Sequence, residues 1–161
     1  MAAPPRQHGA AALAADGLAL LPLLVVAFGL RAARLEYQSL WYDEGSSLFL
    51  SRQSLSAITA GTANDIHPPL YYYLLHFWML AAGRTEFAVR GLSLLQGVLV
   101  VALVLALGRR LFDVRSGLLA AGAAAISPLL VYYSQETRMY MQVTLFGLLA
   151  TYLLARATAS P

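Results

Sequence analysis

The sequence contains no cysteine and no lysine, and only 12% of its 161 residues are charged. Without cysteine the chain has no disulfide framework, no thiolate metal site and no catalytic thiol. A soluble domain usually has about 25% charged residues, so a soluble globular domain is not the first expectation. Disorder is excluded as well, because it needs low hydrophobicity and 59% of these residues are hydrophobic.

Four apolar stretches are candidates for membrane-spanning helices, because crossing a bilayer core of about 30 Å takes about 20 apolar residues. They are residues 10–30, 91–108, 117–133 and 141–155. The third contains Ser127-Pro128, and neighbouring helices are expected to satisfy the carbonyl that such a proline frees. The first has an alternative interpretation as a secretory signal peptide. The sequence therefore predicts an all-α integral membrane protein with about four transmembrane helices.

A fifth apolar stretch, Leu70–Ala82, is too short to cross. Its 13 residues make about 20 Å of helix, and its tyrosines and Trp78 favour the headgroup level of a membrane. The prolines at 68 and 69 suit a first helical turn. We expect an interfacial, juxtamembrane helix in the first outer loop, and a fifth crossing is the alternative.

The distribution of arginine predicts which ends of the helices share a side. Residues 109–115 hold three arginines in seven positions, and short loops rich in arginine stay in the cytoplasm. In the four-span arrangement this loop is cytoplasmic, whereas residues 31–90 and 134–140 are outside. A crossing by Leu70–Ala82 would reverse everything after it.

Three motifs on the predicted outer side carry candidate functional residues. The first is Trp41-Tyr42-Asp43-Glu44-Gly45, in which adjacent carboxylates point in different directions on a helix and so are expected to have separate roles. Asp43 could accept a proton from a hydroxyl nucleophile. Alternatively, Asp43 is the N-cap of a helix from Glu44 to Gln53, with Glu44 favoured by the helix dipole.

The second motif is Asn64-Asp65-Ile66-His67-Pro68-Pro69. Asp65 and His67 either contact a polar headgroup or sugar, or form a capping cluster before a helix that starts at proline. One Asp and one His are too few to predict a metal site.

The third motif runs from Tyr132 to Tyr140 and contains Glu136 and Arg138. An arginine at this surface can bind a phosphate through its two-pronged guanidinium. The alternative is a turn in which Glu136 and Arg138 neutralise one another or extend to the interface. Other arginines at the ends of apolar stretches are interpreted as membrane-flanking anchors; they are Arg31, Arg34, Arg90, Arg109 and Arg110.

In the four-span arrangement all six candidates lie on the outer face: Asp43, Glu44, Asp65, His67, Glu136 and Arg138. Carboxylates and an arginine above an aromatic-rich membrane surface suit a lipid-phosphate substrate with a hydroxyl or amine acceptor. A soluble nucleotide-sugar donor is disfavoured, because no glycine-rich phosphate loop is present.

Four segments, in order, resemble the N-terminal part of the family-39-type GT-C glycosyltransferases. They are WYDEGSSLFL, HPPLYYYLLHFWMLAAGRTEFAVRGLSLL, GRRLF and ISPLLVYYSQETRMYM. This family includes the dolichyl-phosphate-mannose protein mannosyltransferases and the bacterial aminoarabinose transferases, and the similarity runs from about Leu18 to Arg156. The resemblance implies that Asp43 is the catalytic base, with Glu44 beside it. It also makes His67, Glu136 and Arg138 candidates for substrate contact.

We therefore expect residues 1–161 to be the N-terminal part of a GT-C membrane domain, because family members are much longer. The expected activity is transfer of a sugar from a polyprenyl-phosphate donor to a lipid, glycan or protein acceptor on the extracytoplasmic face of a bacterial inner membrane. No cofactor and no nucleic-acid partner are predicted, and a divalent metal is left open. The alternatives are a transporter or channel fragment, disfavoured because the spans hold almost no ionisable residue apart from Asp16, and a small structural membrane subunit without catalysis.

Overall fold

The computed structural model describes residues 10–63 and 65–158, with side chains from Leu20 onward. Within these residues the chain is helical and has no strand, which confirms the all-α prediction. The helices are α1 (Ala10–Ala32), α2 (Tyr42–Ser51), α3 (Leu55–Thr62), α4 (Leu70–Ala82), α5 (Glu86–Leu111), α6 (Val114–Ile126), α7 (Pro128–Ser134) and α8 (Tyr140–Thr158).

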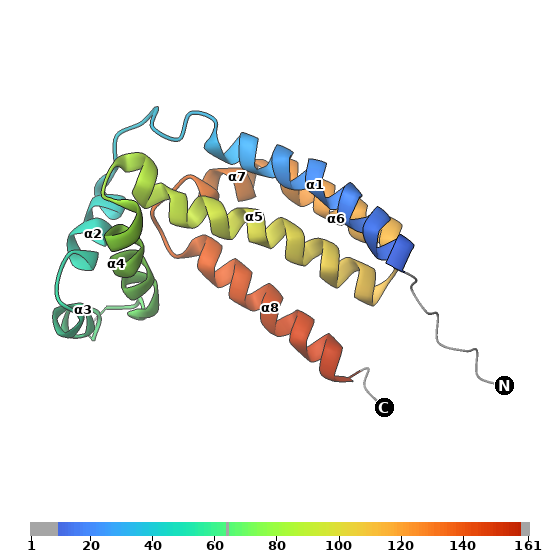
Figure 1. The fold of residues 1–161 in the computed structure, drawn as a ribbon. Helices are drawn as coiled ribbons and strands as arrows, with labels where there is room; N and C mark the ends of the chain where they lie inside the picture. The colour runs from blue at the N-terminus through green and yellow to red at the C-terminus, as the bar shows by residue number, and fades with distance from the viewer. Residues whose placement is uncertain (1–9, 64, 159–161) are drawn as a thin grey trace.

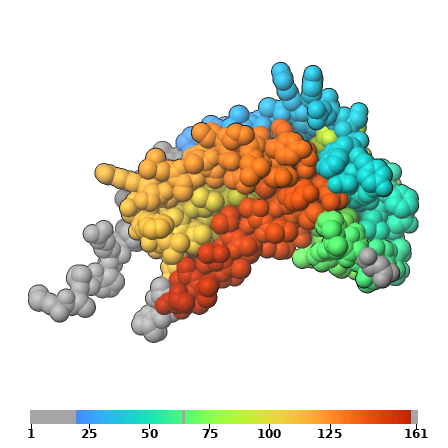
Figure 2. All heavy atoms as spheres, turned by 180° about the vertical axis from the view of Figure 1, so that it is seen from behind, coloured from blue at the N-terminus to red at the C-terminus, as the bar shows by residue number. Residues whose placement is uncertain are grey.

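The helices form a bundle with a cap of short helices at one end (Figure 1). Helix α5 is central and contacts α1, α6, α7 and α8. Helices α2, α3 and α4 gather at the end of the bundle opposite the start of α1 and the end of α8, and α4 lies across the bundle direction rather than along it (Figure 1). Seen from behind, α6, α7 and α8 cover the face of α5 (Figure 2). The short helices of the segment expected to form the first outer loop therefore lie together at one end of the bundle.

Local signals explain where the helices begin and end. The hydroxyl of Thr85 accepts a hydrogen bond from the Ala88 amide at 3.1 Å and caps the start of α5. At the other end of α5, the carboxylate of Asp113 caps α6 by accepting from the Ser116 amide at 2.9 Å. Both are side-chain types that satisfy the free amides of a first helical turn. Gly83, with φ of 92°, ends α4 in a conformation that costs glycine little.

Two apolar clusters hold the parts together. In the cap, the buried cluster consists of Leu48, Ile58, Tyr71, Tyr72, Leu75, Met79, Val89 and Met139. In the bundle, it consists of Ala27, Val101, Leu105, Ala121, Ala124 and Ala125. The alanines of α6 allow close helix packing. Near the turn between them, the backbones of α5 and α6 approach each other so closely that a Cβ added to Gly108 would lie 2.7 Å from the Gly117 Cα.

The predicted span over residues 117–133 is not one helix. It is broken at Ser127 into α6 and α7, which meet at a bend of 57°. Pro128 has no amide hydrogen to donate to the Ala124 carbonyl, so the helical hydrogen bonding stops there. The freed carbonyls of Ala124 and Ala125 accept instead from the guanidinium of Arg31, at 3.2 and 3.0 Å.

The predicted number of four spans is only partly supported. Among the described residues, α5 alone is a single helix long and apolar enough to cross a membrane, and the bent pair α6–α7 passes the same test as a unit. The segment Leu20–Ala32 of α1 is a shorter apolar helix. Helix α4 has the bounds that the sequence predicted. The four-span arrangement and the interfacial position of α4 stay predictions.

Candidate active site

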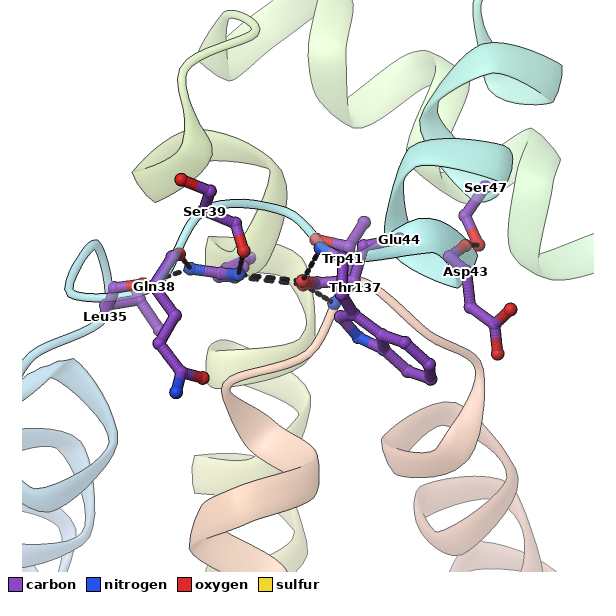
Figure 3. Close-up of polar contacts among 9 residues, drawn as sticks. Leu35, Gln38, Ser39, Trp41, Asp43, Glu44, Ser47 and Thr137 are labelled. Carbon is purple, nitrogen blue, oxygen red and sulfur yellow. Dashed lines mark hydrogen bonds and ion pairs between the residues drawn. The ribbon is translucent and has the colours of Figure 1, made fainter.

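A buried ion pair between Glu44 and Arg90 lies where the cap meets the bundle (Figure 3). The Arg90 Nε donates to Glu44 Oε1 at 2.9 Å, and its Nη2 donates to Oε2 at 2.7 Å. The Thr137 amide donates to Glu44 Oε1 at 2.8 Å. Glu44 is 1% exposed. Through these hydrogen bonds its carboxylate joins α2, α5 and the loop before α8.

Arg90 also fixes the chain between α1 and α2. Its Nη1 donates to the carbonyls of Leu35 and Gln38 at 2.6 and 2.8 Å, and its Nη2 lies 3.5 Å from the Ser39 carbonyl. The interpretation of Arg90 as a membrane-flanking anchor is therefore wrong. Its position at the end of an apolar stretch fitted an anchor, but its partners lie in a distant loop.

The start of α2 excludes one of the two interpretations of Asp43. Helix α2 begins at Tyr42 with Trp41 as its N-cap, so the interpretation of Asp43 as the N-cap is wrong. Glu44 accepts a hydrogen bond from the Trp41 amide at 3.3 Å, which is half of a capping box. The adjacent carboxylates therefore have separate partners, as their places on one helix predicted.

The electrostatics of Glu44 favour its ionised form. Burial acts to raise the pKa of this carboxyl, but the hydrogen bonds from Arg90 and the Thr137 amide outweigh it and bring the pKa below its ordinary value. A carboxylate that accepts several hydrogen bonds and faces an arginine stays charged in this way. Because the folded pKa is lowered, Glu44 stabilises the fold above its ordinary pKa, and this contribution is lost as the pH falls through the folded pKa.

Asp43 is the exposed member of a pair that it forms with Arg138. The Asp43 Oδ2 lies 3.8 Å from Arg138 Nη2, and the Asp43 side chain is 36% exposed. Arg138 is itself buried, and its Nη1 makes long hydrogen bonds of 3.3 Å to Ser47 Oγ and 3.4 Å to the Asp43 carbonyl. Its Nε has no hydrogen-bond partner among the described residues. The guanidinium thus keeps an unused donor beside an exposed carboxylate.

Glu136 is not neutralised by Arg138, contrary to the interpretation of this loop as a self-compensating turn. Arg138 forms its ion pair with Asp43, whereas Glu136 is hydrogen-bonded to the Tyr132 side chain. Burial raises the pKa of the Glu136 carboxyl, and the Tyr132 bond and the charge of Arg138 only partly oppose this. A largely buried carboxylate with one neutral donor is poorly stabilised in its charged form.

A cavity of about 320 Å³ lies beside the Glu44–Arg90 pair. Aromatic rings, amides and charged groups from both loops line it: Arg34, Leu35, Tyr37, Gln38, Ser39, Trp41, Glu44, Arg90, Tyr132, Gln135 and Glu136. Arg34 has a left-handed backbone with φ of 59°, which is uncommon for a residue with a side chain. Its guanidinium lies 5.5 Å from the centre of the Tyr37 ring. Carboxylate, amide and aromatic faces together suit a polyhydroxylated ligand.

Asp65 and His67 lie before α4 and form a separate pair. His67 Nδ1 is 3.2 Å from Asp65 Oδ1, which also accepts from the Ile66 amide at 2.6 Å. Neither side chain caps α4, whose N-cap is Pro69, so the capping interpretation is wrong. The hydroxyl of Tyr72 is influenced by charges of both groups. Its pKa is raised, mainly by burial and also by the carboxylates of Asp65 and Asp43, while the charge of Arg138 opposes the shift.

Arg31 and Gln135 brace the loop that carries Glu136 and Arg138. Arg31 is 0% exposed, and its Nε donates to Ser134 Oγ at 3.1 Å; its interpretation as a flanking anchor is therefore wrong. The Gln135 Nε2 donates to the Arg31 and Ala33 carbonyls at 3.1 and 2.9 Å. Gly97 leaves the room for this contact, because a Cβ there would collide with Arg31 and Ser134. The polar character of Gln135 within the third motif was the only sequence signal for this brace.

Glu136→Gln is expected to raise the melting temperature at neutral pH. Because the folded pKa of Glu136 is raised, its ionised form costs stability when the pH is above that pKa, and glutamine resembles the protonated form. The gain should shrink as the pH falls and vanish below the ordinary carboxyl pKa. Thermal unfolding between pH 4 and 8 measures it, with the exposed Glu36→Gln as control. A gain that is the same at every pH would contradict the assignment.

No group of three or more His, Asp or Glu side chains that could hold a metal ion occurs within the described part of the chain.

A family model described as dolichyl-phosphate-mannose-protein mannosyltransferase matches residues 66–161, more than half of the chain. The matched region contains His67, Arg90, Glu136 and Arg138, and it begins after the segment with Asp43. No curated protein and no solved structure matches the chain.

Proposed function

Because the chain belongs to the dolichyl-phosphate-mannose-protein mannosyltransferase family, a family of membrane glycosyltransferases, we propose a specific reaction for it. The chain spans a bacterial inner membrane several times, with α2–α4 on the extracytoplasmic side. There it transfers a sugar from a polyprenyl-phosphate donor to a hydroxyl of a lipid, glycan or protein acceptor. Asp43 and Arg138 act directly on the reacting groups.

The contact between Asp43 and Arg138 is the observation that carries this proposal. A half-exposed carboxylate lies 3.8 Å from a buried guanidinium whose Nε has no partner in the described residues. Arginine pairs with phosphate through its N–H donors, and the Arg138 Nε is a buried donor whose hydrogen bond is not satisfied within the described residues. Since Arg138 lies in the family-matched region and Asp43 lies outside it, their proximity brings Asp43 to the same site.

In the proposed reaction the acceptor oxygen attacks the anomeric carbon and its proton passes to the Asp43 carboxylate. The bond from that carbon to the phosphate oxygen breaks, and the polyprenyl phosphate leaves with the electron pair. Negative charge then grows on the phosphate, where a positioned cation stabilises the transition state. Arg138 supplies that cation. A general base must reach the proton that it removes, and the exposure of Asp43 provides the access.

The residues around these two have supporting roles in the proposal. The Glu44–Arg90 pair holds the start of α2 and thereby orients Asp43, so Glu44 positions the base and is not itself a base. The cavity lined by Trp41, Tyr132 and Glu136 holds the part of the acceptor away from the reacting hydroxyl. Asp65 and His67 contact the substrate at the outer edge.

Arg138→Gln is expected to slow transfer from the donor. A charge-assisted hydrogen bond contributes about 1.5–3 kcal/mol, so kcat/KM for the donor should fall about 10- to 100-fold, and the loss should include kcat because Arg138 acts on charge that develops in the transition state. The measurement is transfer of labelled sugar from polyprenyl-phosphate donors by the full-length protein in membrane vesicles. Arg84→Gln, at an exposed arginine on the same side, is the matched control. No transfer by the wild type from any donor of this class would overturn the proposed function, whereas an unchanged kcat/KM would remove Arg138 from it.

A further inference from the structure

A second cavity lies at the other end of the bundle, where α1 starts and α8 ends (Figure 1). It has a volume of about 620 Å³ and lies among α1, α5 and α8. Its inner wall is apolar and contains Leu20, Ala102, Leu105 and Ala106. Its polar lining consists of Arg109, Arg110, Asp113 and Tyr152. The cavity thus combines an apolar wall with two arginines and one carboxylate.

The mouth of this cavity is strongly basic. Arg110, Arg115 and Arg156 lie in or next to the turn between α5 and α6 and the last turn of α8. Asp113, the carboxylate in that turn, accepts from the Ser116 amide and hydroxyl as the cap of α6. These three arginines outnumber that carboxylate.

Arg110 is held in place but keeps its charge available. Its Nε and Nη2 donate to the carbonyls of Ala155 and Arg156, at 3.1 and 3.2 Å. These contacts fix the guanidinium at the C-terminal end of α8, and no described carboxylate forms an ion pair with it. Arg156, whose backbone carbonyl accepts from Arg110, carries a second guanidinium in the same turn of α8, and two neighbouring arginines can share one phosphate.

Apolar side chains surround these arginines on the outside. Leu111, Phe112 and Leu154 are 52%, 76% and 65% exposed. Exposed apolar residues mixed with arginines are typical of the boundary between hydrocarbon and headgroups. Basic recesses between transmembrane helices on the cytoplasmic side are places where anionic lipid headgroups bind.

We infer that this cavity binds an anionic phospholipid of the inner leaflet. The phosphodiester contacts Arg110 and Arg156, Tyr152 lies beside the glycerol, and one acyl chain extends along the wall formed by Leu105 and Ala106. The charge at the mouth selects an anionic headgroup, and the apolar wall distinguishes a lipid from free phosphate. This inference rests on the proposed membrane insertion but not on sugar transfer, so a binding assay separates the two.

The experiment measures lipid binding to the purified full chain in a neutral detergent. Native mass spectrometry with added phosphatidylglycerol gives the affinity, with phosphatidylcholine as the zwitterionic comparison. We expect phosphatidylglycerol to bind more tightly and to raise the melting temperature. The double variant Arg110→Gln/Arg156→Gln should weaken phosphatidylglycerol about 30-fold, from the usual contribution of two surface arginines. It should leave phosphatidylcholine unchanged.

Two further variants make the result specific. Arg34→Gln/Arg84→Gln removes the same charge at the opposite end and should leave phosphatidylglycerol binding unchanged. Ala106→Phe fills the recess without changing charge and should also weaken phosphatidylglycerol binding. Equal binding of the two lipids would overturn the inference. So would full affinity in both the Arg110→Gln/Arg156→Gln and the Ala106→Phe variants, and so would inorganic phosphate competing as well as the lipid.

Discussion

Asp43→Asn is expected to lower sugar transfer by about 100- to 10,000-fold, the usual cost of removing a general base. Asparagine keeps the size of aspartate and most of its hydrogen bonding, but it cannot take the acceptor proton. Folding should be nearly unaffected, because Asp43 does not cap α2 and an ion pair at a half-exposed carboxylate contributes at most about 1 kcal/mol. Initial rates at saturating donor, together with the melting temperature, measure the two effects separately.

The matched control for Asp43 is Glu36→Gln, which removes a carboxylate from the exposed loop between α1 and α2. Its transfer rate should equal that of the wild type. If Asp43→Asn transfers sugar normally, Asp43 is not the base. If the loss of transfer rate is accompanied by a lower melting temperature, Asp43 instead has a structural role.

Arg90→Met is expected to lower the free energy of unfolding by about 3–5 kcal/mol, the cost of leaving a buried charge without its partner. Glu44 would then keep only backbone amides as donors. The loop from Leu35 to Ser39 would lose the guanidinium that binds its carbonyls. Thermal or denaturant unfolding of the detergent-solubilised protein measures the loss, with the exposed Arg84→Met as control.

Two measurements distinguish the ion pair from simple loss of packing. The double variant Glu44→Leu/Arg90→Met removes both charges and should recover part of the stability, since an apolar pair can replace a buried ion pair. Without Arg90, burial would raise the pKa of Glu44, so the deficit of Arg90→Met should shrink on acidification. A deficit that is unchanged in the double variant and at low pH would show that packing, and not charge, is responsible.

The sequence predicted the parts of the fold that depend on long apolar stretches. The helical fold and the bounds of α4 follow from hydropathy and length. Arginine distribution predicted only that residues 41–45 and 134–140 share a side of the membrane, whereas the structure shows them in contact. Asp43 and Glu44 were also predicted to have separate roles, because adjacent side chains on a helix point in different directions.

Arginine function was the main failure of prediction, and the reason is physical. Arg31 and Arg90 each follow or precede an apolar stretch, and a membrane anchor has the same local sequence. What distinguishes them is a partner far along the chain: Glu44 is 46 residues from Arg90, and the Ala125 carbonyl is 94 residues from Arg31. No local pattern encodes such contacts. Pro128 was visible as a helix breaker, but the donor that replaces its amide was not.

The contact between Arg31 and the broken end of α6 has a consequence for synthesis in the cell. Arg31 leaves the ribosome 94 residues before Ala125, which at 5–20 residues per second is a delay of about 5–20 s. In the proposed membrane arrangement a lone guanidinium is costly in hydrocarbon, so the end of α1 is expected to stay in contact with water during that time. On the same proposal α1 reaches its final position only after residue 125 of 161 has been made, and insertion is coupled to the translation of most of the chain.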